Sequence, residues 1–161
     1  MATRDEIAAC RERLGAAERH YLRDLPTLDV PQVPGIYALW FKRELLYAGI
    51  VTRDPGETTN PNARGLAGRL SAHRTGRMTN HFALSAAFRF VLPALSDKDR
   101  ALLATGELDV RDVQAMTRNW IAANVEFSAI AVPAVVARAA EPVVQRSGLG
   151  GSGPPAFNPL P

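Results

Sequence analysis

Two short apolar stretches separated by only two residues constrain the fold of this chain more than any other feature. Residues 35–41 and 44–51 are rich in aromatic and aliphatic side chains, and only Lys42 and Arg43 lie between them. A two-residue connection can join only antiparallel neighbours, because parallel strands need a much longer crossover. The sequence therefore predicts a β-hairpin over 35–51.

Helices and further strands are predicted on both sides of this hairpin. Apolar residues recur at three- and four-residue spacing over 4–25, and Thr3 with Glu6 forms a capping box before them. Pro26 ends that segment. Further helices are expected at 65–73, 97–105 and 110–123, and after Pro133. Strands are expected at 88–92 and at 125–132, with Glu126 and Ser128 alternating outward.

Length and composition indicate a single globular domain. The chain has 161 residues, of which 47% are hydrophobic and 22% are charged, which excludes a disordered or coiled-coil chain. Its apolar runs are far shorter than the roughly 20 residues of a membrane span, and the N-terminus lacks a signal-peptide pattern. A cytoplasmic location is expected. The lone Cys10 excludes an internal disulfide and a Cys-rich zinc site.

The charges are distributed unevenly along the chain. The formal net charge is +3, but no Asp or Glu occurs between Glu57 and Asp97. The planar guanidinium group suits phosphate oxygens better than lysine does. This interval therefore indicates an anion-binding surface as the alternative to an ordinary solvated face. Its basic residues are Arg64, Arg69, His73, Arg74, Arg77, His81 and Arg89.

Four polar side chains in and before this interval form a constellation suited to phosphate chemistry. Tyr37 and Tyr47 fall in the two predicted strands, where a tyrosine alone would be ordinary. Arg69 and His73 are four residues apart and so share one face of the predicted helix. Together these groups can hold a phosphate, orient water and take up a proton.

These residues resemble the two-part signature of the GIY-YIG nucleases. Gly35-Ile36-Tyr37 matches the first triplet, and Tyr47-Ala48-Gly49 departs from the second only by its alanine. Arg69 and His73 are similar to the arginine and histidine on the helix that follows in the family. The long loop before Arg69 is more similar to the restriction-endonuclease branch than to the repair or homing branches. The resemblance spans about 33–159.

Two C-terminal positions extend the resemblance. Glu141 is placed like the family's metal-binding glutamate, and Phe157-Asn158 is similar to a pair found near the end of the domain. The resemblance implies an α+β domain over 1–161, in which helices flank a central antiparallel sheet of about three strands. Residues 1–25 would then be an N-terminal helix and 96–123 a helical insertion.

The resemblance also implies a function. The expected activity is hydrolysis of DNA phosphodiester bonds by an endonuclease that depends on Mg²⁺ or Mn²⁺, of restriction or defence type. Glu141 would hold the metal ion, and Arg69 would grip a non-bridging phosphate oxygen. Tyr37 is the expected base, with Tyr47 and His73 orienting water and phosphate.

Supporting roles are expected for residues near these groups. Asn158 would add a polar contact in the catalytic site. The resemblance and the basic interval together predict that DNA is contacted by Arg64, Arg74, Arg77 and His81. Specificity would lie in the loop 52–64 and in the insertion 96–123. A homodimer would allow such a small domain to cut both strands.

Three alternatives remain open from the sequence. Pro142 should kink the helix at Glu141, which makes Glu126 the second candidate for the metal ligand. No lysine follows Tyr47 closely, so Lys42 is the nearest lysine that could assist proton transfer. The chain would be a catalytically inactive nucleic-acid-binding module if the fold and the arginines were kept without turnover.

Overall fold

A four-stranded antiparallel sheet lies at the centre of the part of the chain that is described. The computed structural model describes residues 1–53 and 65–158. The strand order is β1-β4-β2-β3, and every neighbouring pair is antiparallel. The predicted α+β class is confirmed, with a two-residue edge strand added to the three expected ones. The strands are β1 (His20–Tyr21), β2 (Gly35–Phe41), β3 (Glu44–Val51) and β4 (Val125–Ala131).

The predicted hairpin is confirmed as β2 and β3. Its two-residue turn places Lys42 in the left-handed region, with φ of 56°. The register pairs Tyr37 with Gly49 and Leu39 with Tyr47. Directly paired residues project to the same face of a sheet, so both tyrosines lie on one face.

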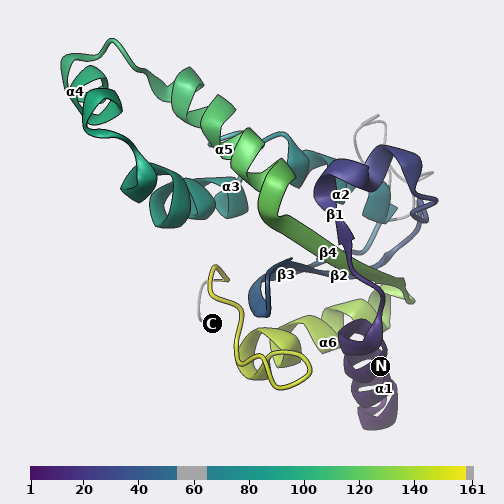
Figure 1. Cartoon of the computed structure of the whole chain (residues 1–161). Helices are drawn as coiled ribbons and strands as arrows, with labels where there is room; N and C mark the ends of the chain where they lie inside the picture. Colours follow the sequence, from purple (N-terminus) through teal and green to yellow (C-terminus); the bar gives the residue numbers. More distant parts are fainter. Residues whose placement is uncertain (54–64, 159–161) are drawn as a thin grey trace.

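Helices cover both faces of the sheet (Figure 1). One core joins the sheet to α1 and α6, and the other joins it to α2, α3 and α5. This explains why β2 is buried along almost its whole length. In the described residues, no helix has both the length and the apolar character needed to cross a membrane. The helices are α1 (Arg4–Ala16), α2 (Gly65–Arg74), α3 (His81–Ala86), α4 (Asp97–Thr105), α5 (Val110–Asn124) and α6 (Ala134–Ser147).

The N-terminal helix is shorter than the 1–25 expected from the sequence. It begins at the predicted capping box but ends at Ala16, and the chain continues through β1 into a 3-10 turn, Leu22–Thr27. Leu14 is buried in the α1/α6 core, whereas Leu22 is buried in the core on the opposite face. One straight helix could not reach both cores, so the apolar spacing over 4–25 belongs to two separate elements.

The strand predicted at 88–92 is wrong. Residues Ala87–Val91 form a π-helical turn and Leu92–Ala94 a 3-10 turn, both continuing from α3. The alternation that suggested a strand arises because Phe90 stacks on Trp120, with ring centroids 4.3 Å apart, while Phe88 is 66% exposed. The predicted helices 97–105 and 110–123 are confirmed as α4 and α5, and α4 lies far from the sheet (Figure 1).

The strand predicted at 125–132 is confirmed as β4, but Ser128 does not face solvent. Ser128 is buried, and its Oγ accepts a hydrogen bond from Nε1 of the buried Trp40 at 3.1 Å. Glu126 pairs with Trp40 in the sheet and is half-buried. Because α1 and α6 cover this face, alternation along β4 separates two cores rather than core from water.

The C-terminal tail runs along the exposed edge of β3. Backbone N–H groups of Ala156 and Phe157 donate to the carbonyls of Leu45 and Leu46, at 3.0 and 2.8 Å. The Asn158 side chain continues this pairing, because it accepts from the N–H of Ala48 at 2.7 Å and donates to its carbonyl at 2.9 Å. The tail thereby satisfies backbone groups that an edge strand would leave open.

Candidate active site

Tyr37 is the residue on which the candidate site is built. It lies in β2 opposite Gly49, and its side chain is fully buried. A Cβ atom at Gly49 would lie 2.4 Å from the Tyr37 Oη and 3.0 Å from Cε1 of Tyr47. No real side chain tolerates such contacts, so the glycine of the second triplet is what allows the Tyr37 ring to lie across β3.

Helix α2 brings both of its predicted site residues to Tyr37. The Nε2 atom of His73 lies 2.7 Å from the Tyr37 Oη, and Nε of Arg69 donates to the same oxygen at 3.3 Å. The predicted helix and the shared face of Arg69 and His73 are therefore confirmed. The Tyr47 ring also packs against the cluster, tilted relative to the His73 ring, with the two ring centroids 5.4 Å apart.

The direction of the hydrogen bonds follows from Asn80, which caps the N-terminus of α3. Its Oδ1 accepts from the backbone N–H of Phe82 at 3.0 Å and lies 3.2 Å from Nδ1 of His73. Since Oδ1 can only accept, the proton of the neutral imidazole is on Nδ1. Nε2 is then an acceptor, and the Tyr37 hydroxyl donates to it.

Burial fixes the protonation states of this pair. Burial, with Arg69 acting in the same direction, lowers the pKa of His73 to about 3. Burial, together with the neighbouring Tyr47, raises the pKa of Tyr37, and the charge of Arg69 only partly offsets this. At neutral pH the resting protein therefore holds a neutral imidazole and a protonated phenol.

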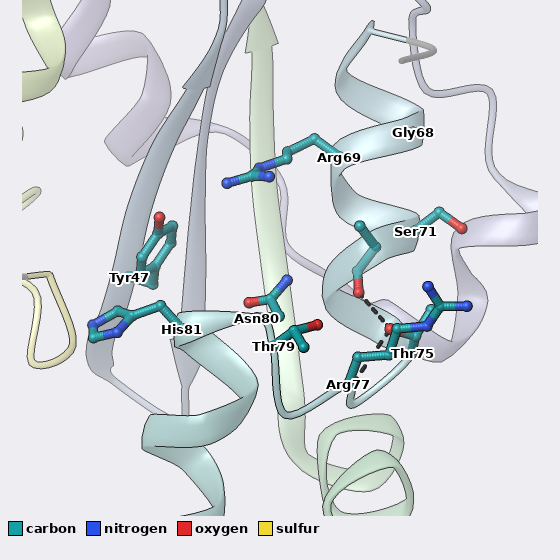
Figure 2. A pocket seen from close by; sticks show the side chains of 10 residues that line it. Tyr47, Gly68, Arg69, Ser71, Thr75, Arg77, Thr79, Asn80 and His81 are labelled. Carbon is teal, nitrogen blue, oxygen red and sulfur yellow. Dashed lines mark hydrogen bonds between the residues drawn. The ribbon is translucent and has the colours of Figure 1, made fainter. Parts of the chain in front are cut away.

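An open pocket of about 750 Å³ lies over these buried groups. Tyr47 and Arg69 stand on opposite walls, with the guanidinium group of Arg69 reaching from α2 toward the strand that carries Tyr47 (Figure 2). Arg77, Asn80 and His81 also line it. Tyr37 and His73 lie beneath the lining, so an anion entering the pocket would meet Arg69 and Tyr47 first.

Glu141 approaches the site from α6. It is half-buried, and Nε2 of Gln145 donates to its Oε1 at 3.2 Å. Burial raises the pKa of this carboxyl group, while the charge of Arg69 opposes the shift. Its carboxylate in turn contributes to the raised pKa of Tyr37. Although Pro142 was expected to kink the helix, α6 runs through it as one element.

The two alternative residues lie away from Tyr37. Glu126 shares a sheet face with its partner Trp40, whereas Tyr37 belongs to the opposite core. Lys42 is at the hairpin turn, and its Nζ lies 5.1 Å from the ring centroid of Phe41. Glu141 is the better placed carboxylate, because its charge acts on Tyr37 and the charge of Arg69 acts on it.

The donor set near Tyr37 fits a hydrated metal ion rather than a protein cage. Within the described ranges, no three His, Cys, Asp or Glu side chains gather into a metal-binding group. Mg²⁺ is commonly held by one or two carboxylates and keeps several waters, with substrate phosphate as a further ligand. A single carboxylate, Glu141, meets that requirement.

The structure shows which atoms the Asn158 side chain contacts. Both ends of its amide are engaged by the backbone of Ala48, the residue between Tyr47 and Gly49. It therefore holds the backbone of the second triplet in position. His81 also holds the tail, since its Nε2 lies 2.8 Å from the Phe157 carbonyl oxygen.

The structure separates the arginines of the acid-free interval. Arg69 and Arg77 line the pocket, and Arg74 lies at the end of α2. Arg89 is committed to an ion pair with Glu44 at 2.8 Å. Arg64 lies outside the described residues, as does most of the loop 52–64.

Some residues near the site were missed in the sequence. Asn80 had a local signal, because asparagine is a preferred N-cap and His81–Ala86 follows it. Arg23 and Arg118 had none, since they lie far from the acid-free interval in sequence. Both line a second pocket together with Arg74 and Arg77.

Comparisons with known proteins do not add to this geometry. No family model, no curated protein and no solved structure matches the chain. The GIY-YIG resemblance thus remains a prediction from the residues quoted above.

The close approach at Gly49 predicts the effect of a single methyl group. Gly49→Ala should lower the free energy of unfolding by about 1–3 kcal/mol, because the Tyr37 ring would have to move. Gly15→Ala is the matched control, since its Cβ would meet no atom closer than 3.6 Å and alanine favours the helix. Urea unfolding measures both. Equal stability of the two variants would contradict the packing of Tyr37 over Gly49.

The lowered pKa of His73 predicts how stability depends on pH. Between the unfolded pKa of about 6.5 and the folded value of about 3, the unfolded chain binds more protons, so stability falls as pH falls. His73 should account for a loss of about 2 kcal/mol between pH 7 and pH 5.

His73→Gln should remove this contribution and flatten the acid side of the profile, whatever it does to stability at pH 7. His20→Gln is the control and should keep the slope, because His73 is intact. The raised pKa of Glu141 acts in the opposite sense and is common to all three proteins. The free energy of unfolding of each protein is measured by urea unfolding at pH 7 and pH 5. An equal loss of stability between the two pH values in His73→Gln and in the wild type would refute the neutral, buried imidazole.

Proposed function

We propose that this protein is a divalent-metal-dependent endonuclease of the GIY-YIG type that hydrolyses DNA phosphodiester bonds. The observation that carries the proposal is the convergence of Arg69 and His73 on the hydroxyl of Tyr37, beneath an open pocket. Tyr37, Arg69 and His73 all belong to the group of side chains that the sequence predicts for phosphate chemistry. Their convergence supports the chemistry implied by the resemblance.

Arg69 is the group that stabilises charge on the phosphate. Its Nε donates to Tyr37, and its guanidinium group lines the pocket, where it would meet an anion. A guanidinium group can contact two phosphate oxygens in parallel, and charge stabilisation of this kind is usually the largest single contribution to catalysis.

Tyr37 and His73 form the proton-handling pair. Hydrolysis needs an acceptor for the proton of the attacking water, and a tyrosine can serve only after losing its own proton. In the resting protein this loss is opposed by burial and by Glu141. The phenol therefore becomes a base only when further positive charge is added at the site. Nε2 of His73 accepts the hydrogen bond of this phenol and orients it.

Glu141 is the residue that would hold the divalent ion. When bound, such an ion supplies positive charge beside the phosphate and lowers the pKa of nearby acidic groups. Gln145 restrains the carboxylate by a hydrogen bond. Because Glu141 is half-buried, bulk water competes less with the ion for its oxygens.

The inactive binding module is the competing function. The raised pKa of Tyr37 is the observation that favours it, since a protonated phenol is not a base. Supercoiled plasmid incubated with the protein and Mg²⁺ or Mn²⁺ separates the two. Nicked or linear product that disappears with EDTA supports the nuclease. Binding without any product supports the inactive module.

Arg69→Lys should reduce cleavage by roughly 10²- to 10³-fold, because lysine keeps the charge but lacks the planar, two-pronged geometry of the guanidinium group. The fold, followed by circular dichroism, should persist. The matched control is Arg89→Lys, which changes an arginine paired with Glu44 on the surface. Near-normal cleavage by Arg69→Lys would mean that this residue is an ordinary surface charge.

Glu141→Gln should abolish cleavage, because glutamine cannot supply the negative charge that holds a divalent ion. DNA binding should be retained or strengthened, since a negative charge near the phosphate is lost. Glu126→Gln is the control and should cleave almost normally. A plasmid time course at several Mn²⁺ concentrations, with gel-shift binding alongside, measures both. Robust cleavage by Glu141→Gln would place the metal elsewhere.

A further inference from the structure

A second basic pocket lies next to the candidate active site. It has a volume of about 580 Å³ and shares Thr75 and Arg77 with the first pocket. Three more arginines line it: Arg23 from the 3-10 turn, Arg74 from the end of α2 and Arg118 from α5. In the part of the chain that the structure describes, no acidic residue belongs to this lining.

The positive charge of this pocket is largely uncompensated. Among the described residues, no carboxylate forms an ion pair with Arg74, Arg77 or Arg118. Arg23 has Asp24 at 3.7 Å, but both side chains are about half exposed, and such pairs contribute little. Four guanidinium groups from different elements repel one another unless an anion lies between them.

The turn that carries Arg77 is packed tightly against α5. Gly76 has φ of 67°, and a Cβ atom there would lie 2.8 Å from the backbone nitrogen of Arg118. The backbone N–H of Met78 donates to Oε1 of Gln114 at 3.4 Å. The turn and α5 are thus held together, so the arginines of the second pocket are grouped before any ligand arrives.

The shared lining indicates an extended ligand. A single phosphate would occupy one pocket and leave the positive charge of the arginines in the other pocket unneutralised. A strand with regularly spaced phosphates could pass from Arg69 over Arg77 to Arg118 and neutralise both. Phosphate contacts of this kind position a nucleic acid without reading its sequence.

We propose that the Arg23, Arg74, Arg77 and Arg118 pocket binds backbone phosphates of duplex DNA that flank the bond to be cleaved. This rests on the proposed function, because it identifies where the same substrate continues beyond the candidate active site. The insertion would then contribute α5 to DNA positioning, while α2 serves both pockets.

The test compares two double variants that remove the same charge. Arg23→Ala/Arg118→Ala removes two arginines of the pocket. Arg4→Ala/Arg13→Ala removes two exposed arginines of α1, which packs against the opposite face of the sheet. Binding of a fluorescent 20-base-pair duplex is measured by anisotropy in EDTA over a range of salt concentrations. Circular dichroism and urea unfolding establish that both variants are folded.

The slope of log K against log salt should become less steep by about 1.8 in the pocket variant, since each neutralised phosphate contributes about 0.9. The α1 variant should keep the wild-type slope. A single Arg118→Gln substitution, at an exposed helix position, should reduce the slope by about 0.9 and guards against a folding defect in the double variant.

Equal slopes for the two double variants would overturn the proposed phosphate contacts, as would the absence of duplex binding by the wild type. Plasmid cleavage is followed separately. If the wild type cleaves and the slopes are equal, the nuclease proposal stands and this inference fails. If the slopes differ but no cleavage occurs, the pocket binds DNA and the nuclease proposal fails.

Discussion

The pairing of Tyr37 with Gly49 is the constraint on which the rest of the site depends. The phenol can cross β3 only because position 49 has no side chain, and only there does it meet α2. A slip of one residue in the hairpin would turn Tyr37 toward α1 and α6, because the side-chain period of a strand is two. Arg69 and His73 would then lose the hydroxyl group that both of them contact. The two-residue turn and the Asn158 amide on Ala48 both hold this register.

The buried polar cluster is stable because its hydrogen bonds run in one direction. Burying a hydroxyl group and an imidazole is costly unless each finds a partner. Here Arg69 donates to Tyr37, Tyr37 donates to His73, and His73 donates to Asn80. The same oxygen of Asn80 also accepts a hydrogen bond from the backbone N–H of Phe82, at the N-terminus of α3. The cluster therefore links the sheet, α2 and α3.

The sequence was sufficient for the features that depend on local spacing. The hairpin, the helix with Arg69 and His73 on one face, and α5 all follow from periodicity and turn length. The sequence predictions were wrong where tertiary contacts, and not the expected secondary structure, produce the spacing of apolar residues. Residues 88–92 alternate because one phenylalanine stacks on Trp120, and 4–25 contacts two different cores. Neither circumstance can be read from neighbouring residues.

The partners of single polar side chains were also beyond the sequence. Asn158 was selected as a polar group near the site, but which atoms it would meet depended on the path of the tail along β3. Arg118 became relevant only because the turn at Gly76 packs against α5. Such contacts join residues distant in the chain, and nothing in their local spacing identifies them.

The strand order explains how groups from both layers reach one site. Arg69 belongs to α2 on one face of the sheet, and Glu141 belongs to α6, which packs on the other. A sheet normally separates such groups, yet the charge of Arg69 acts on the pKa of Glu141. Both helices contact the same edge strand, β3. The absent side chain at Gly49 leaves the space on β3 that the Tyr37 ring occupies. The charges of Arg69 and Glu141, which belong to helices on opposite faces of the sheet, therefore both act on the same buried phenol.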